Sequence, residues 1–375
     1  MADAAAPGRD ELAALLALAE LPGIGPARLR ALLGAFETAL GAIRAPFGAV
    51  CAVPGFSRAA ASAIRGAAPE SGIAILERLE RLGARVLSAG SGDFPPLLRE
   101  IPDPPVVLYV WGDVRLLSRP AAAIVGSRNH TGYGAEAARL LATGVARAAV
   151  VVSGMARGID ALAHTAALDA GGGSVGVLGN GFGVVYPAAN RALYDRMIRH
   201  GCLVTELPPG DRPHAGAFPR RNRLISGLAL ATVVVEAAPK SGALITADAA
   251  LEQGRSVLAV PGPITSPTSL GCNRLIQQGA KPALCAADVL EELGLPAPRA
   301  PAVPPVPAGP RPAARPPDLD GLQIALWEAL AAEAQHVDAL AAISRAGSGD
   351  VLTALTELEL RGLVRQEPGL RFALS

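Results

Sequence analysis

The chain has 375 residues, of which 50% are hydrophobic and 18% are charged, and its formal net charge is +1. This length predicts two or three domains with a sizeable buried core. The small net charge excludes a uniformly basic surface, so any anion-binding face must come from local clustering. The amino terminus carries acidic residues where a signal peptide would begin with basic ones, and no apolar run approaches the roughly 18 residues of a membrane helix. We therefore expect a cytoplasmic protein that makes no contact with a membrane.

Residues 1–84 are expected to form a small helical domain of the helix-hairpin-helix or SAM-like kind. The stretch "LPGIGPARLRALLGAF" (21–36) has a Gly-x-Gly turn between apolar helices, and "VPGFSRAAASAI" (53–64) repeats its Pro-Gly turn. In a functional copy the turn amides would face a DNA phosphate, helped by Arg28 and Arg30. Because this segment contains 8 basic and 8 acidic residues, a purely structural helical domain is the alternative.

Residues 85–295 alternate short β-branched runs with amphipathic stretches, which predicts a doubly wound, Rossmann-like α/β fold around a parallel sheet. The strands are expected at 121–125, 149–153, 174–178, 202–206, 231–236 and 256–260, with helices between them. These runs show little polar alternation, as expected for strands covered on both faces. Ligands of such folds bind beyond the carboxyl ends of the strands, so we expect a site in the loops that follow these runs.

The loop after the first of these strands, "GSRNHTGYG" (126–134), resembles an anion cradle at a helix start. Gly126 lets the backbone approach a ligand, Ser127 and the amides after it can donate hydrogen bonds, and Arg128 adds a fixed charge. The loop thus indicates a phosphate-sized ligand.

Three further loops combine glycines with basic or polar side chains. "SGMARGIDALAH" (153–164) places Arg157 between two glycines, and "GNGFGVVYP" (179–187) is a glycine-rich turn that ends on proline. "FPRRNRLISGLALATVVVEAAPKSG" (218–242) begins with three arginines in four positions and ends on a Lys-Ser-Gly turn.

The last part of the chain consists of a linker and a second small domain. Residues 296–317 are nearly all Pro, Ala and Arg, which predicts an extended polyproline spacer. Residues 318–375 predict three helices and a hairpin around Pro368 and Gly369, the pattern of a winged helix. The usual winged helix binds DNA through its third helix. This one has 4 basic against 9 acidic residues, so we expect it to contact a further protein partner instead of DNA.

The fingerprints of nucleotide enzymes are absent. The glycines of 179–187 lack the G-x-G-x-x-G spacing, and Lys240 follows a proline where a Walker loop has glycine. Four cysteines without a C-x-x-C spacing indicate neither disulfides nor a zinc site, and no catalytic triad or carboxylate pair emerges. We therefore expect no catalytic residue, no cofactor and no metal. His164 is expected to be packed, and capping or pairing with arginines is expected of Asp160, Glu206 and Glu236.

What remains is a set of glycine loops with arginines, which is typical of phosphate binding. Several such pockets along one face would follow a nucleic-acid backbone, with an affinity that falls as salt rises. Aromatic residues make up only 3% of the chain, which excludes an extended base-stacking platform. Phe218 and Tyr133 lie inside the candidate loops and could each meet a base.

Six motifs in one order, between about 85 and 292, resemble the DNA-processing protein DprA (Smf) family. They are "AAIVGSRNHTGYG", "VVSGMARGIDALAHTAAL", "GVLGNGFGVVYPAAN", "FPRRNRLISGL", "VVVEAAPKSGALITADAALEQGR" and "AVPGPITSPTSLGCNRLIQQGA". The resemblance implies a non-enzymatic protein that binds single-stranded DNA and protects it during natural transformation. It also implies a homodimer of the Rossmann-like domain that loads the RecA recombinase onto the strand.

The resemblance places the family's Gly-Ser-Arg motif on residues 126–128 and its Phe-Pro-x-Arg-Asn-Arg motif on residues 218–223. The DNA-binding residues expected from the loops and the motifs together are Gly126, Ser127, Arg128, Arg157, Arg212, Phe218, Arg220, Arg221, Asn222, Arg223, Lys240 and Ser241. Arg221 and Arg223 precede an apolar helix, so burial against Glu206 or Glu236 is the alternative for these two.

Two other functions fit a Rossmann-like fold. A nucleotide-ribose hydrolase would carry a P-G-G-x-G-T-x-x-E loop, whereas this chain has "SGALITADAALE" with only Glu252 nearby. A regulatory protein that senses a nucleotide is the third alternative. Release of free base from nucleoside monophosphates would support the hydrolase, and tighter binding of a mononucleotide than of an oligonucleotide would support the sensor.

Overall fold

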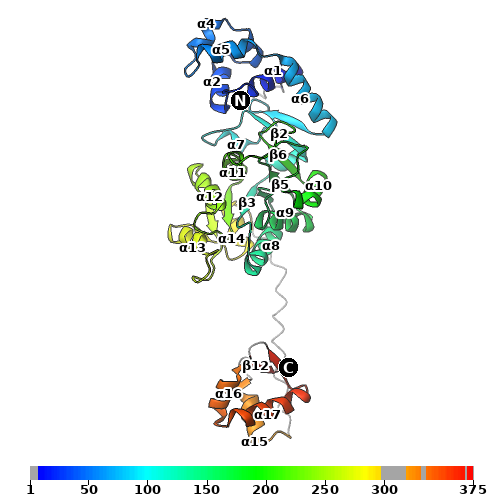
Figure 1. Ribbon diagram of the computed structural model, residues 1–375, viewed down its shortest axis with the longest axis vertical. Helices are drawn as coiled ribbons and strands as arrows, with labels where there is room; N and C mark the ends of the chain where they lie inside the picture. The colour runs from blue at the N-terminus through cyan, green and yellow to red at the C-terminus, as the bar shows by residue number, and fades with distance from the viewer. Residues whose placement is uncertain (1–6, 297–317, 331–334, 368–369, 375) are drawn as a thin grey trace. The chain divides into compact units, whose positions relative to one another are not determined.

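The computed structural model describes residues 7–296, 318–330, 335–367 and 370–374. They form two compact units, one within Met1–Pro298 and the other within Arg299–Ser375 (Figure 1). The predicted linker lies outside the described residues except for its first position. No helix in these ranges is both long and apolar enough to cross a membrane.

The first unit begins with six helices: α1 (Arg9–Ala19), α2 (Pro26–Phe36), α3 (Ala39–Arg44), α4 (Phe47–Ala52), α5 (Arg58–Arg65) and α6 (Pro69–Leu82). The two Pro-Gly turns of the sequence connect α1 to α2 and α4 to α5. Gly23 and Gly55 adopt φ angles of 81° and 86° there, which only glycine reaches without strain. The boundary at residue 84 stays a prediction.

A nine-stranded sheet follows, in the order β1-β2-β6-β5-β4-β3-β7-β8-β9. Its strands are β1 (Arg85–Ser88), β2 (Val107–Gly112), β3 (Ala121–Val125), β4 (Val150–Ser153), β5 (Ser174–Val177), β6 (Cys202–Thr205), β7 (Ala231–Val234), β8 (Ser256–Ala259) and β9 (Lys281–Pro282). Strands β3 to β8 pair in parallel, which confirms the predicted doubly wound fold. The six predicted strands are present, each with the predicted length or one or two residues shorter.

Three strands were not predicted from the sequence. The short β1 pairs antiparallel with β2, and β2 pairs antiparallel with β6, so both extend the sheet outside the repeating βαβ pattern. Two residues of β9 complete the other edge. Strands this short, or without a following helix of their own, give little periodic signal.

The helices and helical turns of this part are α7 (Pro96–Arg99), η1 (Val114–Ser118), α8 (Gly132–Ala146), α9 (Ile159–Asp169), η2 (Ala188–Asn190), α10 (Arg191–His200), α11 (Ala217–Gly227), α12 (Gly242–Glu252), α13 (Leu270–Gln277) and α14 (Ala286–Glu292). Apolar side chains of α8, α9 and α14 share one core with β3, β4 and β7, while those of α11, α12 and α13 pack on the opposite face. The amino-terminal helices share a third core with β2 and β6, beside which Figure 1 shows them.

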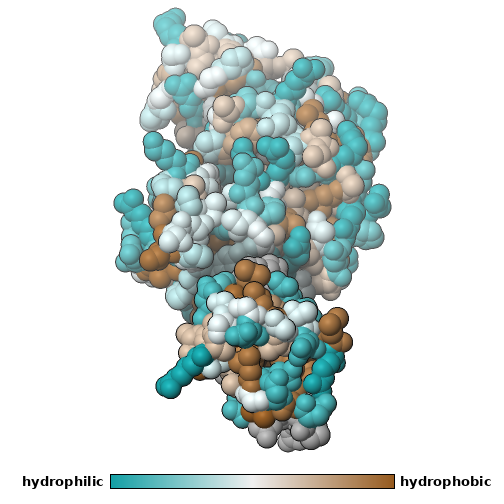
Figure 2. Space-filling model, turned by 60° about the horizontal axis from the view of Figure 1, so that its bottom comes forward, coloured by the Kyte–Doolittle hydropathy of each residue, from teal (hydrophilic) through white to brown (hydrophobic). Residues whose placement is uncertain are grey.

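The second unit consists of α15 (Gly321–Leu330), β10 (Gln335–His336), α16 (Val337–Ser344), α17 (Ser348–Leu360), β11 (Val364–Glu367) and β12 (Arg371–Leu374). Its strands pair in the order β10-β12-β11, as in a winged helix. The predicted turn at Pro368 and Gly369 lies outside the described residues. Figure 2 shows hydrophobic side chains exposed on one side of this unit.

Each unit contains one of the two tryptophans of the chain. Trp111 at the end of β2 meets the rings of Phe182 and Tyr194 edge-on, with centroids 5.6 and 6.1 Å away. Trp327 in α15 is 5% exposed and belongs to the core of the second unit.

Candidate nucleic-acid interface

A groove of about 720 Å³ opens beyond the carboxyl ends of β3 and β7. The strand order reverses at this point, because the chain adds β4, β5 and β6 on one side of β3 and then places β7 on the other. Doubly wound folds bind ligands at such a reversal. The groove collects eight of the twelve residues predicted to bind DNA: Gly126, Ser127, Arg128, Phe218, Arg221, Asn222, Lys240 and Ser241.

A smaller hollow adjoins the groove and shares Arg128, Phe218 and Arg221 with it. Arg157, also predicted, lines this hollow and is exposed. The loops after β3 and β4 meet at Gly158, whose φ is 83° and where any side chain would collide with the Ser127 carbonyl group. Glycine is therefore required to bring the Arg128 and Arg157 loops together.

Arg128 lies over an aromatic cluster at the junction of the two cavities. Its guanidinium carbon is 5.8 Å from the centroid of the Phe218 ring, which is cation–π distance. The Tyr186 ring lies 5.6 Å from the Phe218 ring and is 45% exposed. Tyr186 was not among the predicted DNA-binding residues, although it stands at the end of the glycine-rich turn 179–187. Tyr133, offered instead, donates a 2.7 Å hydrogen bond to the Pro261 carbonyl oxygen and does not line the groove.

Arg221 is 6% exposed, so its side chain is buried and bonded within the protein instead of projecting into solvent. Its Nη1 donates to the carbonyl oxygens of Gly154 and Val177 at the ends of β4 and β5. Burial lowers the pKa of this guanidinium to about 10, against the opposing effect of Asp160 and with a smaller contribution from Arg128. The side chain therefore supplies positive charge to the floor of the groove from a fixed position.

Asp160 and His164 are buried beneath the loop after β4. The Asp160 carboxylate accepts hydrogen bonds from the amides of Gly154 and Ala156, at 3.1 and 3.4 Å, and burial raises its pKa although Arg221 favours the charged form. His164 Nδ1 lies 2.8 Å from Ser174 Oγ, and burial lowers its pKa to about 3. His164 is therefore packed, as predicted, and its burial disfavours the charged form.

The helix start after β3 is not the open anion cradle that the sequence suggested. Glu236 accepts hydrogen bonds from the amide and the hydroxyl of Thr131, at 2.9 and 2.6 Å, just before α8. A third bond, of 3.2 Å, comes from Thr268. This internal carboxylate occupies the place where an anion would bind, so the ligand-facing charge of this loop comes from Arg128.

The start of α12 is open to the groove instead. Ser241 caps the helix by accepting a 3.3 Å hydrogen bond from the Ala243 amide, and Gly242 at the helix start and Thr246 one turn later line the cavity. Lys240 is exposed, and no ion pair to another described residue engages it. A helix start beside an unpaired lysine is a suitable phosphate site.

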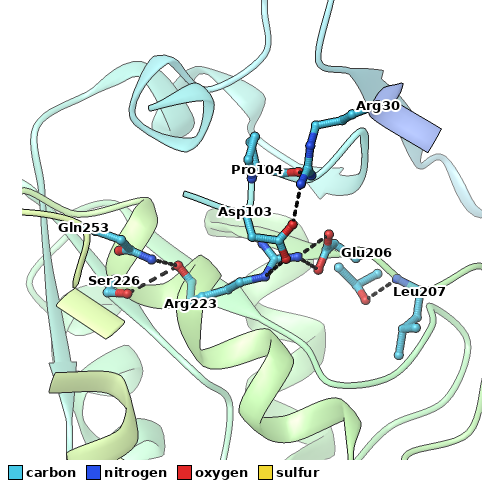
Figure 3. A network of polar contacts seen from close by, with 9 residues as sticks. Arg30, Asp103, Pro104, Glu206, Leu207, Arg223, Ser226 and Gln253 are labelled. Atoms are coloured by element: carbon cyan, nitrogen blue, oxygen red, sulfur yellow. Dashed lines mark hydrogen bonds and ion pairs between the residues drawn. The ribbon is translucent and has the colours of Figure 1, made fainter. Parts of the chain in front are cut away.

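Arg223 does not line the groove and belongs instead to the network of polar contacts drawn in Figure 3. Its Nη2 donates to both carboxylate oxygens of Glu206, at 2.7 and 2.6 Å, and its Nε lies 3.3 Å from Asp103. Burial raises the pKa of Glu206, although Arg223 opposes this effect. The structure thus places Arg223 in the pairing role that the sequence gave as the alternative to DNA contact.

Two other predicted arginines lie outside the groove. Arg220 is exposed beside Glu206 and Leu207, where it lines a separate small cavity. Arg212 is exposed in the loop after β6 and lines neither the groove nor the adjoining hollow. Arg220 belongs to α11 and Arg212 lies shortly before it, so both contribute charge near the site without lining the groove.

The groove and the adjoining hollow together therefore combine exposed basic side chains, a helix start and two aromatic rings, and the carboxylates beside them are already hydrogen-bonded. Among the described residues, no group of three or more His, Cys, Asp or Glu side chains could hold a metal. The arrangement is suited to binding a polyanion that also carries flat rings.

Comparisons with known proteins agree with this geometry. Residues 85–294 match the family model of DNA recombination-mediator protein A, and residues 310–369 match that of the DprA winged helix domain. The chain is 35% identical to Protein Smf of Synechocystis over 393 aligned positions, covering 96% of this chain and 98% of that protein. It is 44% identical to DNA processing protein DprA of Bacillus subtilis, covering 58% of this chain and 74% of that one.

Two solved structures are similar to this one. DNA processing protein A from Streptococcus pneumoniae has a TM-score of 0.68 at 33% identity, covering 76% of this chain and 98% of that chain. DNA processing protein A from Helicobacter pylori, described for its single-stranded DNA binding mode, has a TM-score of 0.51 at 28% identity, covering 56% and 95%. With its groove, its six ordered motifs and its winged helix, the chain belongs to the DNA recombination-mediator protein A family, also called DprA or Smf.

Proposed function

We propose that this protein binds single-stranded DNA in the groove between the loops after β3 and β7, without acting as an enzyme. The observation that carries the proposal is the convergence of Arg128, Lys240 and the open start of α12 on one cavity. Phosphates would lie against these groups, because Arg128 and Lys240 carry positive charge and the start of α12 is the positive end of a helix dipole. Bases would turn toward Phe218 and Tyr186, whose rings are partly exposed at the junction of the two cavities.

The hydrolase alternative lacks a suitably placed base. Glu252 is in the last turn of α12, whereas the groove is formed by the first turn of the same helix. At 1.5 Å per residue, the length of α12 separates the two by about 15 Å. The buried carboxyl of Asp160 is bonded to amides of its own loop, so it is not poised to activate water.

Single-stranded DNA is expected to bind much more tightly than a duplex of the same length. The aromatic rings and the two joined cavities can receive bases only when these are unpaired. For the single strand, the logarithm of affinity should fall linearly with the logarithm of salt concentration because bound cations are released. Fluorescence anisotropy of labelled oligonucleotides over a range of salt measures both quantities. Equal affinity for the duplex, or no salt dependence, would contradict the proposal.

Family membership supports a proposal about the wider role of the protein. We propose that the protein acts in the cytoplasm as a homodimer of the Rossmann-like part, protects incoming single strands during natural transformation, and loads the RecA recombinase onto them. The support for these assignments is the resemblance of the six motifs and the match of residues 85–294 to the recombination-mediator family.

The winged helix is proposed to bind a protein partner. On α17, Glu357 accepts a 2.8 Å hydrogen bond from Gln323, and the nearby Arg361 is neutralised by Asp318 at 2.7 Å. Ile343 and Leu360 are 56% and 85% exposed, which is more apolar exposure than a DNA-reading surface needs.

The isolated segment 318–375 is accordingly expected not to bind DNA, because its 9 acidic residues outnumber its 4 basic ones and repel phosphate. Titration of the segment against labelled single-stranded and duplex oligonucleotides at moderate salt checks this, with the full chain as the positive control. Saturable binding by the segment alone would refute it.

A further inference from the structure

Helix α11 is held from two opposite sides. Arg221 and Arg223 are two residues apart, which places them about 200° apart around a helix. Arg221 ties α11 to the ends of β4 and β5 on the groove side. On the other side, Arg223 is bound by Glu206 and Asp103. The position of Phe218 and Asn222 in the groove wall therefore depends on both attachments.

The attachment away from the groove reaches the amino-terminal helices (Figure 3). Arg30 of α2 donates a 2.7 Å hydrogen bond to one carboxylate oxygen of Asp103 and another bond to the Pro104 carbonyl oxygen. The second Asp103 oxygen faces Arg223. One carboxylate, in the segment between α7 and β2, thus joins a helix of the first 84 residues to the helix that forms the groove.

Arg223 depends on this carboxylate. Its side chain is 14% exposed, and its Nη1 is buried without a hydrogen-bond partner in the described structure. Asp103 is 50% exposed, so without Arg30 it is free to turn toward solvent. Arg223 would then keep only Glu206, and the side of α11 away from the groove would be held less firmly.

We propose that Arg30 is a positioning residue for DNA binding, which acts through the chain Arg30–Asp103–Arg223–Glu206 to fix α11 and with it the wall of the groove. The inference rests on the proposed binding of single-stranded DNA. It gives the amino-terminal helices a role at the site without requiring that they touch DNA.

The test compares Arg30→Gln and Asp103→Asn in the full chain. Both should weaken single-stranded DNA binding by about three- to tenfold, which lies within the range for coupling through packed and ion-paired networks. The double variant should be no weaker than either single one, because both break the same chain. Arg30→Lys, which can still pair with Asp103, should recover most of the affinity. Arg65→Gln removes the same charge from an exposed position at the end of α5, and should change little.

Salt dependence separates positioning from direct contact. If Arg30 only positions α11, the slope of log affinity against log salt stays at the wild-type value while the whole line moves down. A slope that falls by about 0.7 would mean that Arg30 itself neutralises a phosphate, and would overturn the proposal. Additive losses in the double variant would overturn it as well.

Hydrogen exchange of the free protein gives a second readout that needs no DNA. Amides of residues 217–227 should exchange faster in Arg30→Gln than in the wild type or in Arg65→Gln, since α11 is less firmly held. Unchanged exchange in α11 would overturn the proposed coupling even if the wild type binds DNA as expected. Faster exchange with unchanged affinity would show that α11 moves without affecting the site, which also overturns the proposal.

Discussion

Replacing Arg223 by alanine is expected to lower the free energy of unfolding of the first unit by about 3 to 5 kcal/mol, the usual cost of removing one partner of a buried ion pair. The reason is the carboxylate left behind. Glu206 is 11% exposed and is bonded through both oxygens to Arg223. Without the guanidinium, a desolvated charge would remain beside Asp103, whose own charge disfavours ionisation of Glu206.

The free energy of unfolding that Arg223→Ala loses should depend on pH in a defined direction. Burial already holds the pKa of Glu206 above its ordinary value in the folded protein, and loss of Arg223 raises it further. A carboxyl whose folded pKa exceeds its unfolded pKa destabilises the fold where it must ionise, and this penalty disappears as pH falls through the folded value to the unfolded one. The deficit of Arg223→Ala is therefore largest at neutral pH and smaller in acid.

Urea unfolding at pH 7 and pH 5 measures this difference. Arg212→Ala, which removes an arginine from an exposed loop position, is the control and should stay within about 0.5 kcal/mol of the wild type. A deficit of the same size at both pH values would show that lost packing, rather than the stranded carboxylate, dominates. A deficit no larger than that of the control would refute the pairing role.

Replacing Arg128 by alanine should do the opposite: little change in stability and a large loss of binding. Arg128 is exposed, and its charge lies close enough to the buried Arg221 to lower the pKa of that group. Its removal relieves a repulsion, so stability should change by less than about 0.5 kcal/mol. A hydrogen bond to a charged group contributes about 1.5 to 3 kcal/mol, which corresponds to roughly ten- to a hundredfold in Kd.

The salt slope should also fall by about 0.7, because one phosphate contact is lost. Arg128→Lys should give an intermediate affinity, since it keeps the charge but not the planar contact with Phe218. Arg139→Ala, an exposed arginine of α8 that does not line the groove, is the matched control. An Arg128→Ala protein that melts early yet binds normally would show that the loop is structural.

The convergence of Arg128 and Lys240 could be predicted from the sequence for a topological reason. Each follows a buried β-branched run, and the carboxyl ends of parallel strands meet at one edge of a sheet. The six runs of 85–295 that define this edge were recognisable because strands covered on both faces are continuously apolar. The winged helix could be predicted as well, because the apolar positions of its helices recur at helical spacing.

The roles of individual arginines could not be predicted in this way. Residues 220, 221 and 223 carry the same side chain within one helical turn, and the side each faces depends on partners distant in sequence. Asp103 lies in the proline-rich stretch "IPDPPVV", which shows no periodicity and no motif. Glu236 was recognised as a candidate capping residue. Its place at the start of α8 could not be predicted, because it depends on where the fold puts Thr131.

The two tryptophans make the two units optically separable. Trp111 reports on the core that the amino-terminal helices share with the sheet, and Trp327 on the core of the winged helix. Replacing either one by phenylalanine leaves tryptophan emission from a single unit in an otherwise intact chain. The unfolding of each unit can then be followed separately, which tests whether the two compact units unfold together or in two steps.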